Sequence, residues 1–287
     1  MHLEKEIEEC YISELDKLIN RFFKLSTTFV EYSCYAPGMH DVILYNSKSN
    51  KLTYDHEYFV FTKSTKTLKS IKMLLKEGQN EDVIILLRSI YENYLNARYL
   101  NEHEEEYTNF LENPLNVAYG YYIMESTGQI TNRDDRTVVG EQKNPSKMVL
   151  GKDKHYFYDF YDIFSRYSHC NAGIIEHYME GANFTIEKEN KNLETYLFVV
   201  FVYTKLFEHI VTVEGEDFKN HKIEKDCYEI VLESLELQEQ IFQALIEQYN
   251  ANDSTFLKYS NKKMKGLLKD MKKSLKEELG SVKKHNN

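Results

Sequence analysis

Apolar residues recur at three- and four-residue steps along most of the chain, the spacing that places side chains on one face of an α-helix. The first such helix is predicted over Leu3–Tyr32. The same spacing predicts later helices over Leu52–Glu77, Glu81–Leu100, Ser168–Met179, Asn190–Val213, Lys219–Tyr249 and Thr255–Leu279. The pattern therefore predicts an all-α protein, an antiparallel multi-helix bundle.

The stretch Glu81–Leu100 is apolar on nearly all sides, which is typical of a central helix that other helices surround. It nevertheless carries Arg88, Glu92 and Arg98, and buried ionised groups are tolerated only when they are paired and hydrogen-bonded. Arg88 and Glu92 are four residues apart, so they share a helix face and can pair directly. Such a pair either holds neighbouring helices in register or lines a polar pocket.

The segments between the helices are marked by glycine, proline and polar residues. Gly78 is predicted to end one helix and Asn80 to cap the next, and the short link predicts an antiparallel hairpin. Cys34–Asn50 is the place where a strand is expected. Glu102–Ser126 is predicted to continue as a helix with a kink at its proline, and the polar Thr127–Gly151 to form a surface loop or lid.

Charge is unevenly distributed along the 287 residues. The formal net charge of −10 argues against a protein whose whole surface binds nucleic acid. Lys258–Lys284, in contrast, holds ten lysines against three acidic residues. This helix could bind an acidic partner, RNA or a membrane surface, or it could simply cover the core with its lysines in water. The predicted organisation is a helix and loop over 1–51, a bundle over 52–250 and a basic helix over 251–287.

The cysteines and the apolar runs argue for a reduced, soluble protein. The four cysteines are isolated from one another and form no CxxC motif, so no structural metal is expected. No glycine-rich phosphate loop or dinucleotide fingerprint is present, so no cofactor is expected either. The acidic N-terminus has no signal-peptide core, and no apolar run reaches the length of a membrane span. A cytoplasmic location is the prediction.

A second cluster of candidate residues lies in Ser165–Glu180. It contains Arg166, His169 and His177, and histidine is the natural general acid or base near neutral pH. The two histidines do not share one narrow helix face, and their spacing does not suit a two-histidine metal grip. They are either satisfied core residues or part of a catalytic group.

Two segments together, LLRSIYENYLNARYL (Leu86–Leu100) and RYSHCNAGIIEHY (Arg166–Tyr178), resemble a bacterial helical family known as domain of unknown function 5677. That family typically shows R-S-x-x-E on a core helix and, later, Y-x-x-x-S or Y-S followed by His. The matching residues here are Arg88, Ser89 and Glu92 in the first segment, and Tyr167, Ser168 and His169 or His177 in the second.

The family in turn looks like a distant relative of HEPN domains, helical bundles found in bacterial RNases, toxins and abortive phage-defence effectors. Their catalytic signature is an arginine followed, after four to six residues, by a histidine. Ser165–Glu180 departs from this spacing, whereas Arg98 and His103 match it literally. The alternative is a composite site, with Arg88 from one helix and His169 or His177 from another.

The resemblance implies a toxin-like or abortive-infection effector that acts on RNA, a metal-independent ribonuclease with histidine as general acid or base. Arginine would contact the phosphate. From the residues alone, a non-catalytic interaction protein is the alternative. It would act as a homodimer or higher oligomer, or would dock a protein partner through Lys258–Lys284. The sequence leaves open whether the protein is an enzyme.

Overall fold

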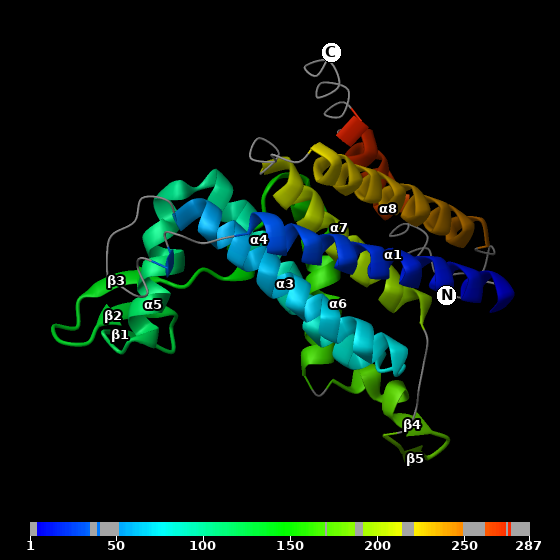
Figure 1. Ribbon diagram of the computed structural model, residues 1–287. Helices are drawn as coiled ribbons and strands as arrows, with labels where there is room; N and C mark the ends of the chain where they lie inside the picture. Colours follow the sequence, from blue (N-terminus) through cyan, green and yellow to red (C-terminus); the bar gives the residue numbers. More distant parts are fainter. Residues whose placement is uncertain are drawn as a thin grey trace.

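The computed structural model describes residues 5–34, 39–40, 52–169, 171–186, 192–213, 221–248, 262–273 and 275–276. Its long helices are α1 (Lys5–Ser33), α3 (Leu52–Lys76), α4 (Asn80–Glu102), α6 (Phe157–Ser168), α7 (Leu193–Val213) and α8 (His221–Gln248). They pack as a multi-helix bundle (Figure 1), which confirms the predicted all-α class. None of the described helices combines the length and the apolar character needed to cross a membrane.

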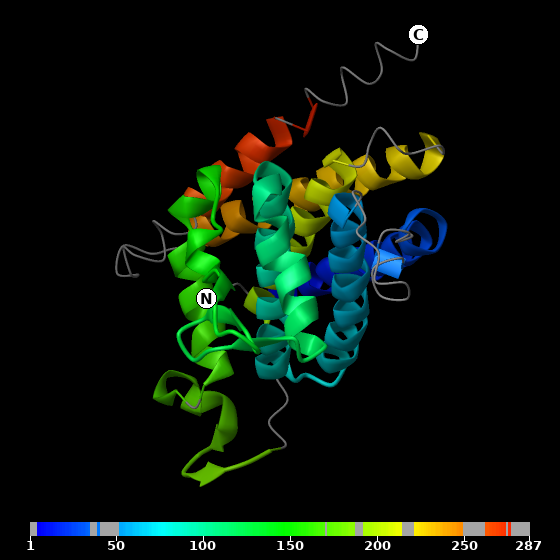
Figure 2. The same cartoon turned by 90° about the vertical axis from the view of Figure 1, so that its left-hand side faces the viewer.

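Two helices form the centre of the bundle. α4 packs against α3, α6 and α7, and α7 packs in turn against α1 and α8; Figure 2 shows α3 and α4 side by side. Leu87 and Ile90 on α4, and Val199 and Leu206 on α7, are completely buried. The central position predicted for Leu86–Leu100 is therefore confirmed.

The link between α3 and α4 is a tight turn, as the sequence predicts. Gly78 takes a positive φ of 70°, which glycine adopts without steric cost. The backbone nitrogen of Gln79 then donates to the carbonyl oxygen of Leu74 (3.0 Å) and closes the end of α3. The prediction that Asn80 caps α4 is wrong, because Gln79 occupies that position and Asn80 is already helical.

The chain after α4 does not form the kinked helix predicted over Glu102–Ser126. α4 ends at Glu102, and three short elements follow: the 3₁₀ turn η1 (Glu104–Glu106), the π-helical turn η2 (Thr108–Glu112) and the helix α5 (Asn113–Ala118). Pro114 lies in the first turn of α5. At that position its missing N–H costs no helix hydrogen bond, so the proline begins a helix instead of bending one.

The polar stretch predicted as a loop over Thr127–Gly151 contains two strands of a small sheet, so the loop prediction is wrong there. Three antiparallel strands pair in the order β1 (Tyr122–Met124), β2 (Gln129–Asn132) and β3 (Val138–Glu141). Each has only three or four residues, too few for an alternating pattern to stand out. The strand expected in Cys34–Asn50 falls on positions that lie mostly outside the described residues.

The sheet lies against η2 and α5 through Gly140 on β3. A Cβ atom at this position would overlap the side-chain amides of Asn109 and Asn113. Those amides are held in place, because Asn113 Nδ2 donates to Asn109 Oδ1 (3.2 Å) and to the carbonyl oxygen of Val139 (3.3 Å). Glycine at this position therefore lets β3 approach the two amides without displacing them.

The single helix predicted over Ser168–Met179 is also wrong. α6 ends at Ser168, and His169 has extended backbone angles. A separate 3₁₀ helix, η5 (Ala172–Tyr178), leads into the hairpin of β4 (Met179–Glu180) and β5 (Asn183–Phe184). The side-chain oxygen of Asn171 accepts from the backbone nitrogen of Gly173 (2.8 Å) and caps the start of η5, the position that asparagine favours.

Residues 262–273 and 275–276 are helical and cover one side of the bundle (Figure 1). Their apolar side chains join the core of the molecule, namely Met264, Leu268, Met271 and Leu275. Their lysines pair with carboxylates of α6 and α8, for example Lys263 with Asp159 (3.1 Å) and Lys276 with Glu236 (3.6 Å). In this part of the chain the basic helix is a cover for the core.

We expect Leu87→Ala to lower the free energy of unfolding by about 2–5 kcal/mol, because it leaves a cavity in a completely buried part of α4. Ile85→Ala on the same helix is the matched control. Ile85 is 37% exposed, so its truncation should cost about 1 kcal/mol or less. Urea denaturation measures both, and equal losses would contradict the one-sided exposure of α4.

Candidate functional site

Three side chains from α4 and α6 form a closed polar group, which we call the Arg88 trio: Arg88, Glu92 and Tyr161. Arg88 Nε donates to Glu92 Oε1 (2.9 Å), and Arg88 Nη2 donates to the Tyr161 hydroxyl (2.7 Å). That hydroxyl donates to Glu92 Oε1 (3.2 Å). The direct Arg88–Glu92 pairing predicted from the sequence is therefore confirmed, and Tyr161 ties it to α6.

The environment fixes the charge of two members of the trio. Burial favours the neutral form of Arg88, but the hydrogen bond that Arg88 donates to Glu92 and the neighbouring Tyr161 outweigh it and raise the pKa of the guanidinium. Burial, and then the charge of Glu92, raise the pKa of the Tyr161 hydroxyl. Arg88 therefore stays cationic and Tyr161 keeps its proton at neutral pH.

The trio lies in the wall of an open cavity of about 580 Å³, the Arg88 pocket, which is in the usual size range of small-ligand sites. Residues 126–128, between β1 and β2, and residues 142–145, after β3, contribute to the lining. Its apolar lining is Phe110, Pro114, Pro145 and Met148. Four side-chain amides also face it, those of Asn96, Asn109, Gln142 and Asn144.

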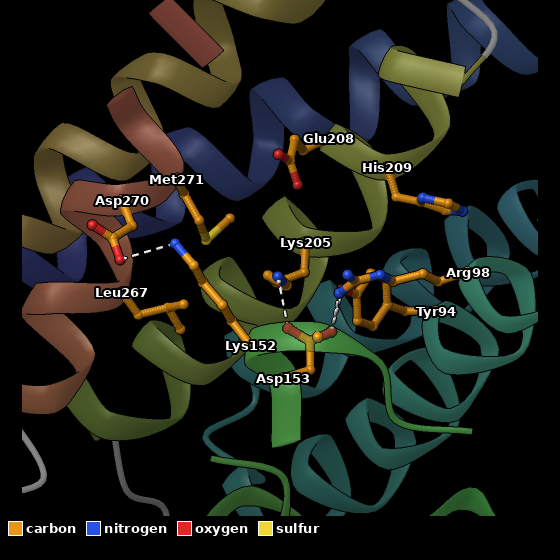
Figure 3. A pocket seen from close by; sticks show the side chains of 11 residues that line it. Tyr94, Arg98, Lys152, Asp153, Lys205, Glu208, His209, Leu267, Asp270 and Met271 are labelled. Atoms are coloured by element: carbon orange, nitrogen blue, oxygen red, sulfur yellow. Dashed lines mark hydrogen bonds and ion pairs between the residues drawn. The ribbon is translucent and has the colours of Figure 1, made fainter. Parts of the chain in front are cut away.

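A second polar group, the Asp153 centre, lies deep between α4, α6 and α7 (Figure 3). Asp153 is 1% exposed. Its Oδ2 accepts from Arg98 Nη1 (2.6 Å) and from the Tyr94 hydroxyl (2.5 Å), and Lys205 Nζ lies 3.1 Å from Oδ1. The Tyr156 hydroxyl also donates to Oδ1. One carboxylate thus holds two cations and two hydroxyls.

The two cations decide the charge of this carboxyl group. Burial alone would raise the pKa of Asp153, but Lys205 and then Arg98 lower it, helped by hydrogen bonds from Tyr156 and Tyr94. The net pKa lies below the usual value for aspartate, so Asp153 is ionised in the folded protein. Burial raises the pKa of the Tyr94 and Tyr156 hydroxyls, so both remain donors.

His209 on α7 lines the same cavity, which has a volume of about 410 Å³. Burial, and then the charges of Arg98 and Lys205, lower the pKa of His209 to about 4. Its Nε2 lies 3.7 Å from Glu57 Oε1, and a further hydrogen bond joins the ring to the backbone of Ala97. His209 is therefore neutral at physiological pH and in contact with protein groups.

The other predicted catalytic residues, namely His103, Arg166, His169 and His177, do not line the Arg88 pocket. Arg166 is exposed and pairs with Asp162, and His169 is exposed at the end of α6. His103 Nδ1 lies 3.1 Å from Glu105 Oε1. The half-buried His177 contacts Glu81 Oε1 (3.2 Å) and the Tyr167 hydroxyl (3.2 Å).

The structure therefore separates the predicted catalytic residues into different places. Among the residues that the structure describes, no histidine lines the Arg88 pocket. The composite site of Arg88 with His169 or His177 is therefore not assembled there. Arg98 belongs to the Asp153 centre and His103 to the end of α4. Although they match the HEPN spacing, each already has a carboxylate partner.

Sequence reasoning missed Tyr161, Asp153, Lys205 and His209. For Tyr161 a signal was available: Tyr161 and Ser165 have the Y-x-x-x-S spacing, and His169 follows. The pattern was instead placed on Tyr167 and Ser168. The other three are single polar residues in apolar or loop segments, and their partners lie far away in the sequence, so no local pattern marks them.

The fold and the pocket define a helical-bundle protein with a polar site between α4, α6 and the small sheet. Residues 57–137 match the model of a family of unknown function (DUF5677), which confirms the resemblance to that family over this segment. The matched segment contains Arg88, Glu92 and most of the other residues that line the Arg88 pocket. No curated protein and no solved structure matches the chain.

We expect Asp153→Asn to lower the free energy of unfolding at pH 7 by about 3–5 kcal/mol, because it removes the carboxylate that faces the buried Lys205 ammonium and accepts a hydrogen bond from Arg98. The control is Asp159→Asn, which removes a surface pair with Lys263 and should cost about 1 kcal/mol or less. Folding lowers the pKa of Asp153. The ionised carboxylate therefore stabilises the fold fully at pH values above the pKa that Asp153 has in the unfolded chain. The difference between wild type and Asp153→Asn should therefore shrink as the pH falls below about 4.

Stability should also fall between pH 6.5 and 4. Burial lowers the pKa of His56 to about 4, as it does for His209. In this window the unfolded chain binds more protons than the folded one, so acid favours unfolding, by on the order of 3 kcal/mol per histidine. His209→Asn keeps a polar side chain and should make this pH dependence shallower in chemical denaturation. An unchanged slope would contradict a neutral, buried His209.

Proposed function

We propose that this protein is an RNA-cleaving effector of the toxin or abortive-infection kind, and that the Arg88 trio is its reacting group. The observation that carries the proposal is an arginine and a carboxylate held together in the wall of an open pocket. An arginine can stabilise the charge that develops on a phosphate, and a carboxylate can accept a proton. Together they can promote cleavage of RNA by its own 2′-hydroxyl.

The charges around the pocket suit an anionic substrate. Arg88 and Lys143 line it with Glu92 as the carboxylate, so cations are in excess in a chain whose net charge is −10. Lys143 Nζ also lies 2.8 Å from Glu106 Oε1. A guanidinium binds two phosphate oxygens in its plane, and a phosphate bound by Arg88 would compete with the Arg88–Glu92 bond and free the carboxylate.

The proposed step follows from these roles. The Glu92 carboxylate accepts the proton of the 2′-hydroxyl as that oxygen attacks the phosphorus. The bond from phosphorus to the 5′-oxygen breaks, and the leaving oxygen takes a proton from water in the open pocket. The products are a 2′,3′-cyclic phosphate and a 5′-hydroxyl end. Arg88 stabilises the charge on the phosphoryl oxygens, and Tyr161 positions Arg88 through its hydroxyl and its ring, whose centre lies 4.8 Å from the guanidinium carbon.

The toxin-like role is supported by the resemblance to HEPN effectors and stays a proposal, as does the distant HEPN relation. In this mechanism Glu92 is the general base, the role for which the resemblance implies a histidine. Among the described residues, the pocket that holds Arg88 offers a carboxylate and no imidazole. Catalysis by His103, His169 or His177 remains an untested prediction.

The alternative, docking of a partner through the basic helix, has less support. The apolar side chains of residues 262–276 that it would need are buried in the protein's own core, and Lys263, Lys272 and Lys276 pair with its own carboxylates. Assembly into a homodimer or higher oligomer is a separate prediction.

The proposal is tested by Glu92→Gln, which keeps the shape of the side chain but removes the proton acceptor. We expect cleavage of a single-stranded RNA oligonucleotide to fall by about 10²–10⁴-fold, with RNA affinity retained. Glu233→Gln is the matched control, because Glu233 forms an exposed pair with Arg21 on the far helices, and it should cleave like wild type. End-group analysis should show 2′,3′-cyclic phosphate.

Three results would reject the assignment. The first is wild-type protein that leaves RNA intact, and the second is Glu92→Gln protein that cleaves at the wild-type rate with the same melting temperature. The third comes from replacing His103, His169 and His177 by alanine together. The triple variant should still cleave, and loss of cleavage in a folded triple variant would return the chemistry to the histidines.

A further inference from the structure

The Arg88 pocket carries more polar groups than cleavage of a phosphate requires. Of its four amides, two already support the protein. Asn109 Nδ2 donates to Glu106 Oε2 (2.9 Å), and Asn144 Oδ1 accepts from the backbone nitrogen of Ser146 (3.1 Å). The side chains of Asn96 and Gln142 make no hydrogen bond within the described residues. Two amides are therefore left for a ligand.

Asn96 is the stronger indication of a ligand. It lies on α4, two turns beyond Arg88, and its side-chain oxygen is buried and has no hydrogen-bond partner among the residues described. A buried acceptor in that state is energetically unfavourable, and a donor from a bound molecule would remove this penalty. The missing partner is thus an N–H or O–H group.

Gln142 faces the same pocket from the sheet. It directly follows β3, and its backbone nitrogen donates to the carbonyl oxygen of Gly128 (2.7 Å). Gly128 has a positive φ of 85°, which lets the turn between β1 and β2 close on that bond. The sheet therefore holds Gln142 at the rim while its exposed side chain remains available.

We propose that the Arg88 pocket binds an adenine base, with Asn96 and Gln142 as the residues that read it. A side-chain amide presents an acceptor beside a donor, the arrangement that matches the amino group and ring nitrogen of adenine. The exocyclic amine supplies the donor that Asn96 lacks. Phe110, Met148 and the two prolines provide apolar walls for a flat ring, since bases stack on such surfaces.

This inference rests on the proposed function in one respect, because it takes the ligand to be a nucleotide whose phosphate Arg88 binds. It adds the base that the site selects, and therefore the position at which RNA is cleaved, next to adenine. Arg88 and the two amides are different residues of one cavity lining, so phosphate and base contacts can be altered separately.

Isothermal titration of the full-length protein with adenosine 5′-monophosphate, uridine 5′-monophosphate and ribose 5-phosphate tests the inference. We expect the adenine nucleotide to bind at least about 10-fold tighter than the other two. Asn96→Leu has nearly the same volume and no acceptor, so it should abolish this preference while affinity for ribose 5-phosphate stays unchanged. Gln142→Ala should weaken the preference. Gln240→Ala, an exposed amide on α8, is the control and should bind like wild type.

Equal affinity for the three compounds, tighter binding of the uridine nucleotide, or no adenine nucleotide binding at all would overturn the inference. Retained preference in Asn96→Leu would also do so, provided that its melting temperature matches wild type. The proposed function fails separately: adenine nucleotide binding without RNA cleavage would leave the base site standing. RNA cleavage without a preference for adenine would leave the nuclease and remove the base site.

Discussion

One buried carboxylate, that of Asp153, links the segments on which the functional site is built. It contacts Arg98 and Tyr94 on α4, Lys205 on α7 and Tyr156 at the beginning of α6. Lys205 is buried against this anion, and removing one charge of a buried pair is strongly destabilising. The Arg88 trio bridges α4 and α6, and its geometry therefore follows from the way this centre fixes those two helices.

Helical periodicity was enough to predict the bundle and its central helix. The apolar faces of α1, α3, α4, α7 and α8 appear in the sequence because burial at every third or fourth residue is a local property. The sheet was missed because strands of three or four residues carry too little pattern. The break at His169 was missed because it is a change of backbone conformation and not of hydrophobicity: His169 is extended, and Asn171 then caps the start of η5 by accepting from the Gly173 nitrogen.

The site was predictable only where its members are close in sequence. Arg88 and Glu92 share a helix turn, so their pairing followed from spacing alone. Tyr161 lies 73 residues from Arg88, and Asp153 lies 55 residues from Arg98, so both partnerships arise from packing. Arg98 shows the difference most clearly. A sequence match suggested that Arg98 acts with His103, whereas in the fold its guanidinium binds the carboxylate of Asp153.

The shape of the Arg88 pocket depends on the absence of a Cβ atom at Gly140 on β3. A Cβ atom at this position would overlap the paired amides of Asn109 and Asn113, so one or both amides would have to move. The Asn109 side chain also lines the Arg88 pocket. A single methyl group at 140 would therefore reshape the pocket wall through Asn109, although it touches no member of the Arg88 trio.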